Sequence, residues 1–332
     1  MKKLLLVSLL SLSFVLFTAC SSKRVFEPED VKDDWEKYGS IEETIVDVTS
    51  DVAMLENRKV ISKDSDIDVL IDEDYRLIAS SDGWIISSTI DGKLRLKQID
   101  ATDIVEEFEL KKTVASASVD DDTLAVLFAD NEMALYSITT KELLLKEQGG
   151  NTLAVDSRIV APYFLDAVVV FPTLDGKVVI ISRSKNKKLR ASIVSSEDNF
   201  NNIIYFDIID RKIVAATANQ ILSMSKKEVR EKYEIRNVTY NGLSIFLTTK
   251  QGEIVSLTPE LQLNAKLKFP FAHFLGLIAR NDKVYALEKE GYLIVAPSDL
   301  SSYEIYEVDV DEGFVFVGKD KFYINDEFIS VE

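Results

Sequence analysis

The sequence repeats one short unit, a polar turn followed by an apolar strand, along most of its length. Six segments share the pattern: DGKLRLKQI, DNEMALYSI, DGKVVIISR, ANQILSMSK, QGEIVSLTP and EGYLIVAPS. Their fourth residues are separated by 39, 45, 43, 33 and 39 residues and are Leu94, Met133, Val178, Ile221, Ile254 and Leu293. A period near 40 residues, with room for four strands, is typical of β-propeller blades.

The segments that flank each unit support the same fold. A more apolar segment precedes each unit (WIISS, LAVLF, AVVVF, KIVAA, SIFLT, KVYAL), and a more polar one follows it (EEFEL, ELLLKE, KLRASI, EKYEI, AKLKF, YEIYEV). Inner strands covered on both faces read as continuous apolar runs, whereas an outermost strand meets water. An irregular β-sandwich is the alternative, but it does not predict six phased units. We therefore predict an all-β fold, a single propeller of seven or eight four-stranded blades.

The two ends of the repeat region supply incomplete sets of strands. Residues 314–332 contain three strand-like runs without a fourth, and residues 43–48 (ETIVDV) form a spare one. Pairing the two ends would complete a blade and remove open sheet edges that invite aggregation. Residues 51–72 are interpreted as a degenerate extra blade. The propeller is thus expected over residues 41–332, closed by N- and C-terminal strands.

The amino terminus has the order of a secretory signal peptide. Two lysines precede an apolar run over residues 4–17, and a small pair leads into Cys20, the sole cysteine of the chain. The run is shorter than the roughly 20 residues of a membrane span. Leu16 and Ala19 stand four and one positions before the cysteine, which resembles a bacterial lipobox. That resemblance implies cleavage before Cys20 and lipidation of its sulfur; a core or redox cysteine is the alternative.

Residues 1–19 are accordingly expected to be a lipoprotein signal peptide. Residues 20–40 are polar, charged and interrupted by a proline, so they are expected to be the lipidated cysteine and a flexible tether. Trp35 and Tyr38 are candidates to dock the end of this tether on the domain. Ser21, rather than aspartate, follows the cysteine, which by analogy with bacterial sorting favours outer-membrane delivery.

The charge of the chain excludes one class of partner. Without residues 1–19 the chain carries 37 basic and 56 acidic side chains, formally −19. Such an excess of carboxylates repels nucleic acid and anionic lipid headgroups. We therefore expect no nucleic-acid partner, and attachment to the membrane only through the lipid.

The residues give little support for catalysis. His273, the sole histidine, lies among bulky apolar residues in FPFAHFLGL, so a half-buried structural role is favoured over that of a ligand or base. A lone cysteine in the leader excludes an intrachain disulfide and a cysteine-based metal site. We predict that the protein is not an enzyme and that it has no cofactor and no metal.

Acidic clusters are interpreted as solvated turns. Asp64, Asp66 and Asp68 alternate as in a calcium loop, but Val69 stands where glycine is needed and Tyr75 stands where glutamate is needed. Two further groups, residues 120–122 and 309–312, fall at strand junctions. With 56 acids some close carboxylate pairs arise by chance, so a carboxylate-dependent hydrolase stays open as the weakest alternative.

The blade pattern resembles one known family. EMALYSITTKELLLKE is similar to the outer hairpin of a quinoprotein-type blade (ALxxxTGxxxW), with Lys141 and Leu145 in place of glycine and tryptophan. Residues 156–182, 200–224 and 276–300 resemble successive blades of the BamB family of outer-membrane lipoproteins. The resemblance implies eight blades and a non-enzymatic scaffold at the periplasmic face of the outer membrane. Its implied partners are the POTRA domains of the BamA-type barrel subunit and other lipoproteins of the assembly machinery.

The resemblance also implies two contact loops, one before Ala161 and one before Asn201. Their candidate partner-binding residues are Leu153, Val155, Ser157 and Arg158 in the first loop, and Asp198, Asn199 and Phe200 in the second. One arginine with a few apolar groups, opposite a loop with an acid, suits a small mixed interface. Ordinary inter-blade turns with Arg158 paired to a local carboxylate are the alternative. A surface or periplasmic propeller that binds another protein or a polysaccharide is the second functional hypothesis.

Overall fold

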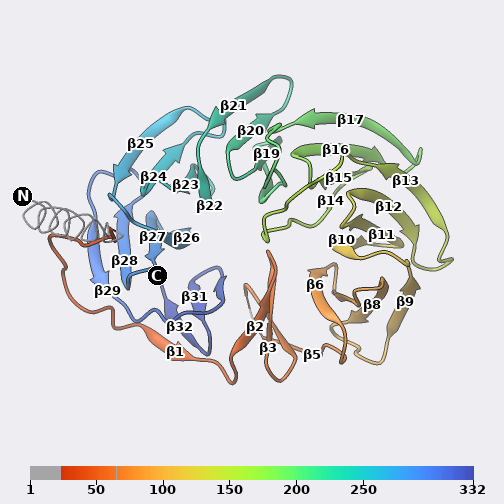
Figure 1. Cartoon of the computed structure of the whole chain (residues 1–332), viewed down its shortest axis with the longest axis horizontal. Coiled ribbons are helices and arrows are strands. Elements are labelled where there is room, and N and C mark those ends of the chain that lie inside the picture. Colours follow the sequence, from red (N-terminus) through yellow and green to blue (C-terminus); the bar gives the residue numbers. More distant parts are fainter. Residues whose placement is uncertain (1–23, 65) are drawn as a thin grey trace, which may run out of the picture.

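The computed structural model of the chain describes residues 24–64 and 66–332, which form eight four-stranded antiparallel sheets. The sheets are arranged as the blades of a ring (Figure 1). The predicted all-β propeller is confirmed, and the blade number is eight. The described residues contain no helix, and so none that could cross a bilayer. The predicted signal peptide, residues 1–19, and the predicted lipidation site, Cys20, lie outside the described residues.

Blades 1 to 4 follow one another along the chain. Their strands are β2 (Ile45–Val48), β3 (Val52–Leu55), β4 (Lys59–Ser62) and β5 (Asp66–Leu70) in blade 1; β6 (Arg76–Ser81), β7 (Trp84–Ser88), β8 (Lys93–Gln98) and β9 (Val105–Glu109) in blade 2; β10 (Val114–Asp120), β11 (Thr123–Phe128), β12 (Glu132–Ser137) and β13 (Leu143–Gln148) in blade 3; and β14 (Tyr163–Leu165), β15 (Val168–Pro172), β16 (Lys177–Ser182) and β17 (Lys187–Ile193) in blade 4.

Blades 5 to 8 continue the ring, and blade 8 takes its outer strand from the other end of the chain. Their strands are β18 (Tyr205–Ile209), β19 (Lys212–Ala216), β20 (Gln220–Met224) and β21 (Glu228–Lys232) in blade 5; β22 (Ile235–Tyr240), β23 (Ile245–Thr249), β24 (Glu253–Leu257) and β25 (Leu263–Lys268) in blade 6; β26 (Phe274–Arg280), β27 (Lys283–Glu288), β28 (Tyr292–Pro297) and β29 (Glu304–Glu307) in blade 7; and β30 (Val315–Val317), β31 (Lys321–Ile324), β32 (Glu327–Ser330) and β1 (Tyr38–Ser40) in blade 8.

The hydrophobic core is divided among the contacts between blades. Eight clusters of buried residues each join two neighbouring blades; Phe128, for example, helps to join blades 2 and 3, and Phe171 helps to join blades 3 and 4. The fourth residue of each repeated unit, such as Leu94 or Leu293, falls in the third strand of its blade and is buried. The outer strands are largely exposed. This gradient is why the flanking segments differ in polarity.

The ring closes between the two ends of the chain, as predicted, but through a different strand. β1 pairs with β32, with Tyr38 opposite Ile329 and Ser40 opposite Glu327. The prediction that residues 43–48 close the ring is wrong, because β2 is the first strand of blade 1 and pairs with β3. Ile45 in β2 is buried between blades 1 and 8, as a first strand requires, whereas the short, exposed β1 suits an outer edge.

Residues 24–37, part of the expected tether, lie against blades 6 to 8. Phe26 is buried and makes edge-to-face contacts with Phe269 and Tyr292. Trp35 donates its indole N–H to the carbonyl oxygen of Ser330 at 2.9 Å. Backbone hydrogen bonds also join this segment to β29. The described part of the segment therefore differs from a flexible tether, because its aromatic residues are anchored on the propeller.

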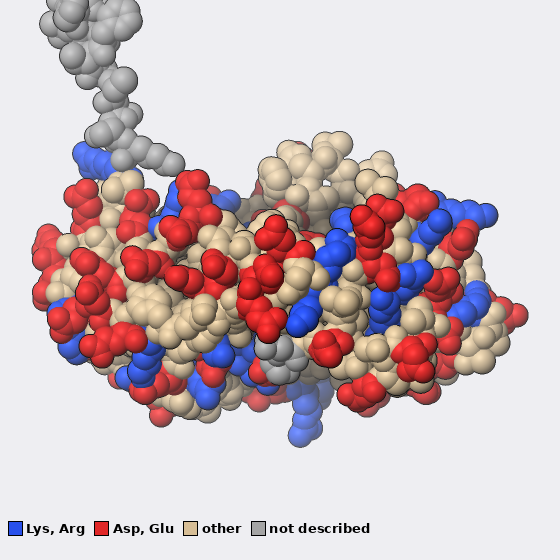
Figure 2. Space-filling model, turned by 90° about the horizontal axis from the view of Figure 1, so that it is seen from below, with Lys and Arg blue, Asp and Glu red and all other residues tan. Residues whose placement is uncertain are grey.

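The strand order places two kinds of connection on each side of the ring. Loops from the outer strand of one blade to the first strand of the next share a side with the hairpins between second and third strands. This side is called the loop face below. Figure 2 shows the ring from its edge, where acidic and basic side chains are mixed over the wall and a group of uncharged residues rises from the upper rim.

Candidate protein-binding surface

The two predicted contact loops lie next to each other on the loop face. The 3–4 loop (residues 149–162) joins blades 3 and 4, and the 4–5 loop (residues 194–204) joins blades 4 and 5. Asn202 is fully buried between them; its side-chain oxygen accepts the backbone N–H of Asp156 at 2.7 Å, and its amide donates to the carbonyl of Arg158 at 3.0 Å. The backbone N–H of Phe200 donates to the carbonyl of Ala154 at 3.0 Å. The loops thus form one hydrogen-bonded unit.

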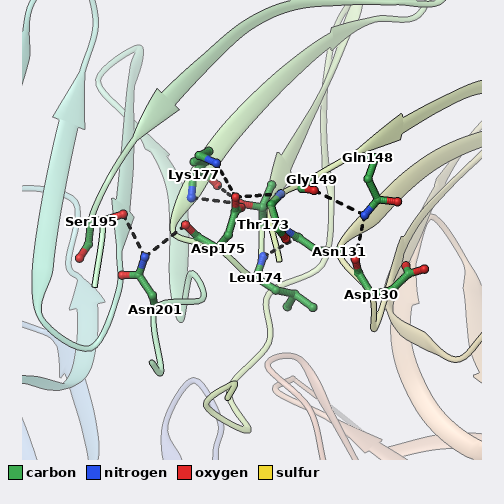
Figure 3. Close-up of polar contacts among 11 residues, drawn as sticks. Asp130, Asn131, Gln148, Gly149, Thr173, Leu174, Asp175, Lys177, Ser195 and Asn201 are labelled. Carbon is green, nitrogen blue, oxygen red and sulfur yellow. Dashed lines mark hydrogen bonds and ion pairs between the residues drawn. The ribbon is translucent and has the colours of Figure 1, made fainter. Parts of the chain in front are cut away.

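The 3–4 loop starts from a network of polar contacts between blades 3 and 4 (Figure 3). The buried side chain of Asn131 donates to the carbonyl of Gly150 at 2.9 Å and accepts the backbone N–H of Leu174 at 2.9 Å. Asp175 accepts the backbone N–H of Gly150 at 3.0 Å and the hydroxyl of Thr173 at 2.6 Å. Buried polar groups that are satisfied in this way hold a loop in one conformation.

The base of the 4–5 loop is fixed by Asn201, whose side-chain amide donates to the carbonyls of Ser195 and Asp175. This contact depends on Gly176, which has a φ of +78°. A Cβ at this position would lie 2.3 Å from the amide nitrogen of Asn201, so only glycine allows the close approach. The same turn therefore supports both loops.

Two apolar side chains of this unit are exposed. Leu153 is 83% exposed and Phe200 is 53% exposed. Phe200 also has a φ of +51°, an uncommon conformation for a bulky residue, and its hydrogen bond to Ala154 helps to hold it there. Among the other predicted residues, Ser157, Asp198 and Asn199 are exposed, and Val155 packs on the cluster between blades 3 and 4.

Arg158 is directed inward. Its guanidinium contacts the carboxylate of Asp156 at 2.5 Å and also donates to the backbone carbonyl of Arg236 in β22 of blade 6. Burial alone would raise the pKa of Asp156, but hydrogen bonds from Arg158 outweigh it and hold that pKa below its usual value. The local carboxylate pairing considered as an alternative is therefore present in the structure.

The sequence gives little indication of several residues that build this surface. Asn131, Asn202 and Arg236 belong to three different blades or loops, and the contacts that bring them to the 3–4 loop span 19 to 78 residues. An Asn-Asn pair before a strand-like run could have drawn attention to Asn202, since asparagine side chains often bond to nearby backbone. Nothing in the residues around Arg236 indicates its neighbours.

The histidine and the acidic residues considered for catalysis or metal binding lie outside the 3–4 and 4–5 loops. His273 is half-buried, and its backbone N–H donates to the carboxylate of Glu288 at 2.8 Å. Asp64 pairs with Lys319, and Asp120 pairs with Arg183. Over residues 24–64 and 66–332, no three His, Cys, Asp or Glu side chains are grouped as metal ligands would be.

A pocket beside β1 and β32 has a volume of about 20 Å³ and includes Tyr38, Asp309 and Asp311 in its lining. This volume is close to that of one water molecule, against roughly 300 Å³ or more for the sites of small organic ligands. The pocket is therefore not a site for a sugar or another organic substrate.

Comparison with known proteins supports the fold and gives one set of sequence relatives. No family model matches the chain. Plasminogen-binding protein PgbB of Helicobacter pylori strain J99 is 28% identical over 360 residues, and PgbB of strain 26695 is 27% identical over the same length. Both alignments cover 94% of this chain and 66% of the relative, so the chain spans slightly less than two thirds of the length of these proteins.

Solved structures with the same architecture are much more distant in sequence. BamB from Moraxella catarrhalis superposes with a TM-score of 0.68 at 11% identity, over 89% of this chain and 99% of that one. The C-terminal WD40 domain of Sif2 gives a TM-score of 0.64 at 11% identity, over 91% of this chain and 99% of that one. At such identities the likeness establishes the fold alone: the chain is a BamB-like eight-bladed propeller, and its sequence relatives are named as plasminogen-binding proteins.

Proposed function

We propose that the protein is a non-enzymatic, lipid-anchored scaffold that binds another protein through the 3–4 and 4–5 loops. The observation that carries the proposal is the exposed pair Leu153 and Phe200 on a base fixed by buried hydrogen bonds. Exposed apolar side chains on a fixed backbone favour binding, because less loop conformational freedom is lost when they are buried by a partner. The mixture of backbone and polar groups around them suits the rim of such an interface.

The first candidate partner is the POTRA region of a BamA-type barrel subunit, together with other lipoproteins of the assembly machinery. The BamB-like fold and the position of the two loops support this candidate. The second candidate is a protein outside the cell, and it is supported by the sequence relatives that are named for plasminogen binding. Both candidates use the protein as a binding scaffold, and they differ in which side of the outer membrane it faces.

The lipid anchor proposed at Cys20 would also orient the scaffold. Phe26 follows Cys20 by six residues, which span at most about 20 Å when fully extended. Phe26 packs against Phe269, in the loop between blades 6 and 7, which belongs to the loop face. The anchor would therefore hold one edge of the loop face close to the bilayer, so the contact loops would meet partners that lie at the membrane.

The proposal is tested by affinity purification of the full-length lipoprotein from detergent-solubilised membranes, with co-purifying proteins identified by mass. The variants Leu153→Asp and Phe200→Ser should each reduce recovery of the partner at least tenfold. Leu243→Asp, at a similarly exposed leucine on the opposite side, and Ile90→Asp, on the loop face of blade 2, are the matched controls. Equal loss in all four variants, or no loss in the first two, would contradict the assignment of the loops.

The identity and location of the partner separate the two candidates. Recovery of a POTRA-containing barrel protein, with the propeller resistant to protease on intact cells, would support the assembly scaffold. Capture of purified plasminogen by intact cells, with the propeller cleaved by added protease, would support the extracellular candidate. Turnover of a substrate that disappears when one of the propeller's carboxylates is replaced would overturn the non-enzymatic assignment.

A further inference from the structure

The first strands of five blades contain the same irregularity near their start. In each, one residue has no partner on the second strand, as in a β-bulge. The bulged residues are Val46, Ile78, Ala115, Arg236 and Leu275. Four of them are apolar, and only Arg236, in β22 of blade 6, carries a charge. A bulge changes the direction of a side chain. The same position recurs in five blades, and it is apolar in four of them and positively charged in blade 6.

The guanidinium of Arg236 lacks a partner within the described residues. Its Nε is buried and makes no hydrogen bond, and the side chain makes no ion pair there. Two other arginines of limited exposure are paired: Arg95 with Asp72, and Arg183 with Asp120. A buried guanidinium nitrogen without a hydrogen-bond acceptor is unfavourable, because polar groups removed from water are normally hydrogen-bonded. Among the described residues, Arg236 thus differs from these two arginines.

The surroundings of Arg236 carry an excess of positive charge. Arg158 lies beside it, and burial together with this second guanidinium lowers the pKa of Arg236 from its ordinary value. Lys250, in the β23–β24 hairpin, lies close enough to lower the pKa of Asp156. Asp156 is the carboxylate paired with Arg158, so it is already engaged by that guanidinium. The side chain of nearby Glu234 is engaged by Gln251 instead.

We propose that Arg236, with Arg158 beside it, is a binding site for a carboxylate group supplied by an acidic segment of a protein partner. The inference rests on the proposed function, because the site adjoins the 3–4 loop. A carboxylate would give the guanidinium the charge-assisted hydrogen bonds that it lacks, and Arg is suited to bidentate contact with such a group. The rest of the chain is strongly acidic, so an acidic segment would be repelled elsewhere and directed to this cluster.

The site is tested with the full chain and a fluorescein-labelled hexaglutamate peptide, followed by fluorescence anisotropy at about 0.15 M salt, where long-range repulsion is screened. Hexaglutamine is the neutral control peptide, and sodium sulfate tests for a free anion. Arg236→Leu, which introduces the residue type found at this position in blade 7, should weaken hexaglutamate binding about tenfold or more. Arg230→Leu, an arginine of the outer strand β21 paired with Glu228, should leave it unchanged.

The melting temperature separates a binding residue from a structural one. Removing an unpaired, half-buried charge should leave the melting temperature of Arg236→Leu unchanged or higher, whereas removing a structural arginine should lower it. The proposal is wrong if hexaglutamate binds equally to the wild type and to Arg236→Leu, or if hexaglutamine binds as tightly as hexaglutamate. It is also wrong if millimolar sulfate displaces the labelled peptide completely and the protein does not distinguish the two peptides. A lower melting temperature with retained peptide binding would also overturn it.

Affinity purification of the partner with these variants distinguishes a failure of the carboxylate site from a failure of the protein-binding function. If Arg236→Leu retains the partner while Leu153→Asp loses it, the carboxylate site is wrong and the protein-binding function stands. If neither variant loses the partner, the proposed function itself fails at these loops.

Discussion

The side-chain oxygen of Asn202 accepts the backbone N–H of Asp156 at 2.7 Å, across 46 residues of sequence. This contact joins the 4–5 loop to the 3–4 loop, and Asp156 in turn holds Arg158. One buried amide therefore links the exposed apolar pair, the inward-facing arginine and the cationic cluster at blade 6. The candidate surface therefore depends on this contact between the two loops and is not formed by either loop alone.

Replacing Asn202 should loosen both loops. Asn202→Ala leaves the N–H of Asp156 and two carbonyls without a partner, so we expect the free energy of unfolding to fall by about 1–3 kcal/mol. Amide hydrogen exchange should accelerate at Asp156 and Phe200 while the strands of blade 4 keep their protection. The exposed Asn264→Ala is the matched control. Unchanged exchange at Asp156 would show that the loops are held by other contacts.

The closing strand should be sensitive to the size of residue 39. A Cβ on Gly39 would lie 2.2 Å from the ring of Phe328 on β32, so Gly39→Ala forces the ring to move. We expect a loss of about 1–3 kcal/mol in the free energy of unfolding, measured by denaturant titration. Adding Phe328→Leu to Gly39→Ala should recover part of this loss. If the double variant is destabilised by the sum of the two single changes, the contact does not limit closure.

The contact between the outer strands of blades 4 and 5 should weaken in acid. Hydrogen bonds from Arg230, Ser192 and Arg190 lower the pKa of Glu228 to about 2 from 4.5. Because the folded-state pKa is depressed, the stabilisation is complete above pH 4.5 and is lost as the pH falls from 4.5 toward 2. Glu228→Gln should therefore cost about 0.5–1 kcal/mol at pH 7, since such surface pairs are screened by solvent, and progressively less below pH 4.5.

The matched control for this prediction is Glu231→Gln, an exposed residue of the same strand that makes no ion pair among the described residues. Urea titrations of the wild type and both variants at several pH values between 7 and 3 measure the difference. A cost of Glu228→Gln that stays constant over this range would contradict the assigned ion pairs.

The amino-terminal segment should detach when its aromatic anchor is removed. Phe26 is buried between blades 6 and 7, so Phe26→Ser exchanges a large apolar contact for a hydroxyl. We expect residues 24–37 to open locally and trypsin to cleave at Lys32 at least tenfold faster, with little change in the melting temperature of the ring. Phe314→Ser, at an exposed phenylalanine before β30, should not accelerate cleavage. Equal cleavage rates in the wild type and Phe26→Ser would show that Phe26 is not the anchor.

The repeat in the sequence was sufficient to predict the propeller. Third-strand residues such as Leu94 and Leu293 must be apolar because they are buried between blades, and turns must recur between strands of similar length. These local requirements leave a visible period. The end strands were harder to assign, because residues 43–48 read as a spare strand while residues 38–40 were placed in the tether. Only the burial of Ile45 against blade 8 decided which one is internal.

The sequence by itself determined the strand pattern, which predicted a propeller of seven or eight blades. Its resemblance to the BamB family indicated the two loops to consider. The tertiary structure alone decided that Asn202 joins those loops, that Arg158 faces inward and that Arg236 has no partner among the described residues. The physical reason is range: strand formation follows from neighbours two residues apart, whereas these contacts join residues 44 to 78 positions apart. Such contacts exist only after the ring has brought its blades together, and no local pattern encodes them.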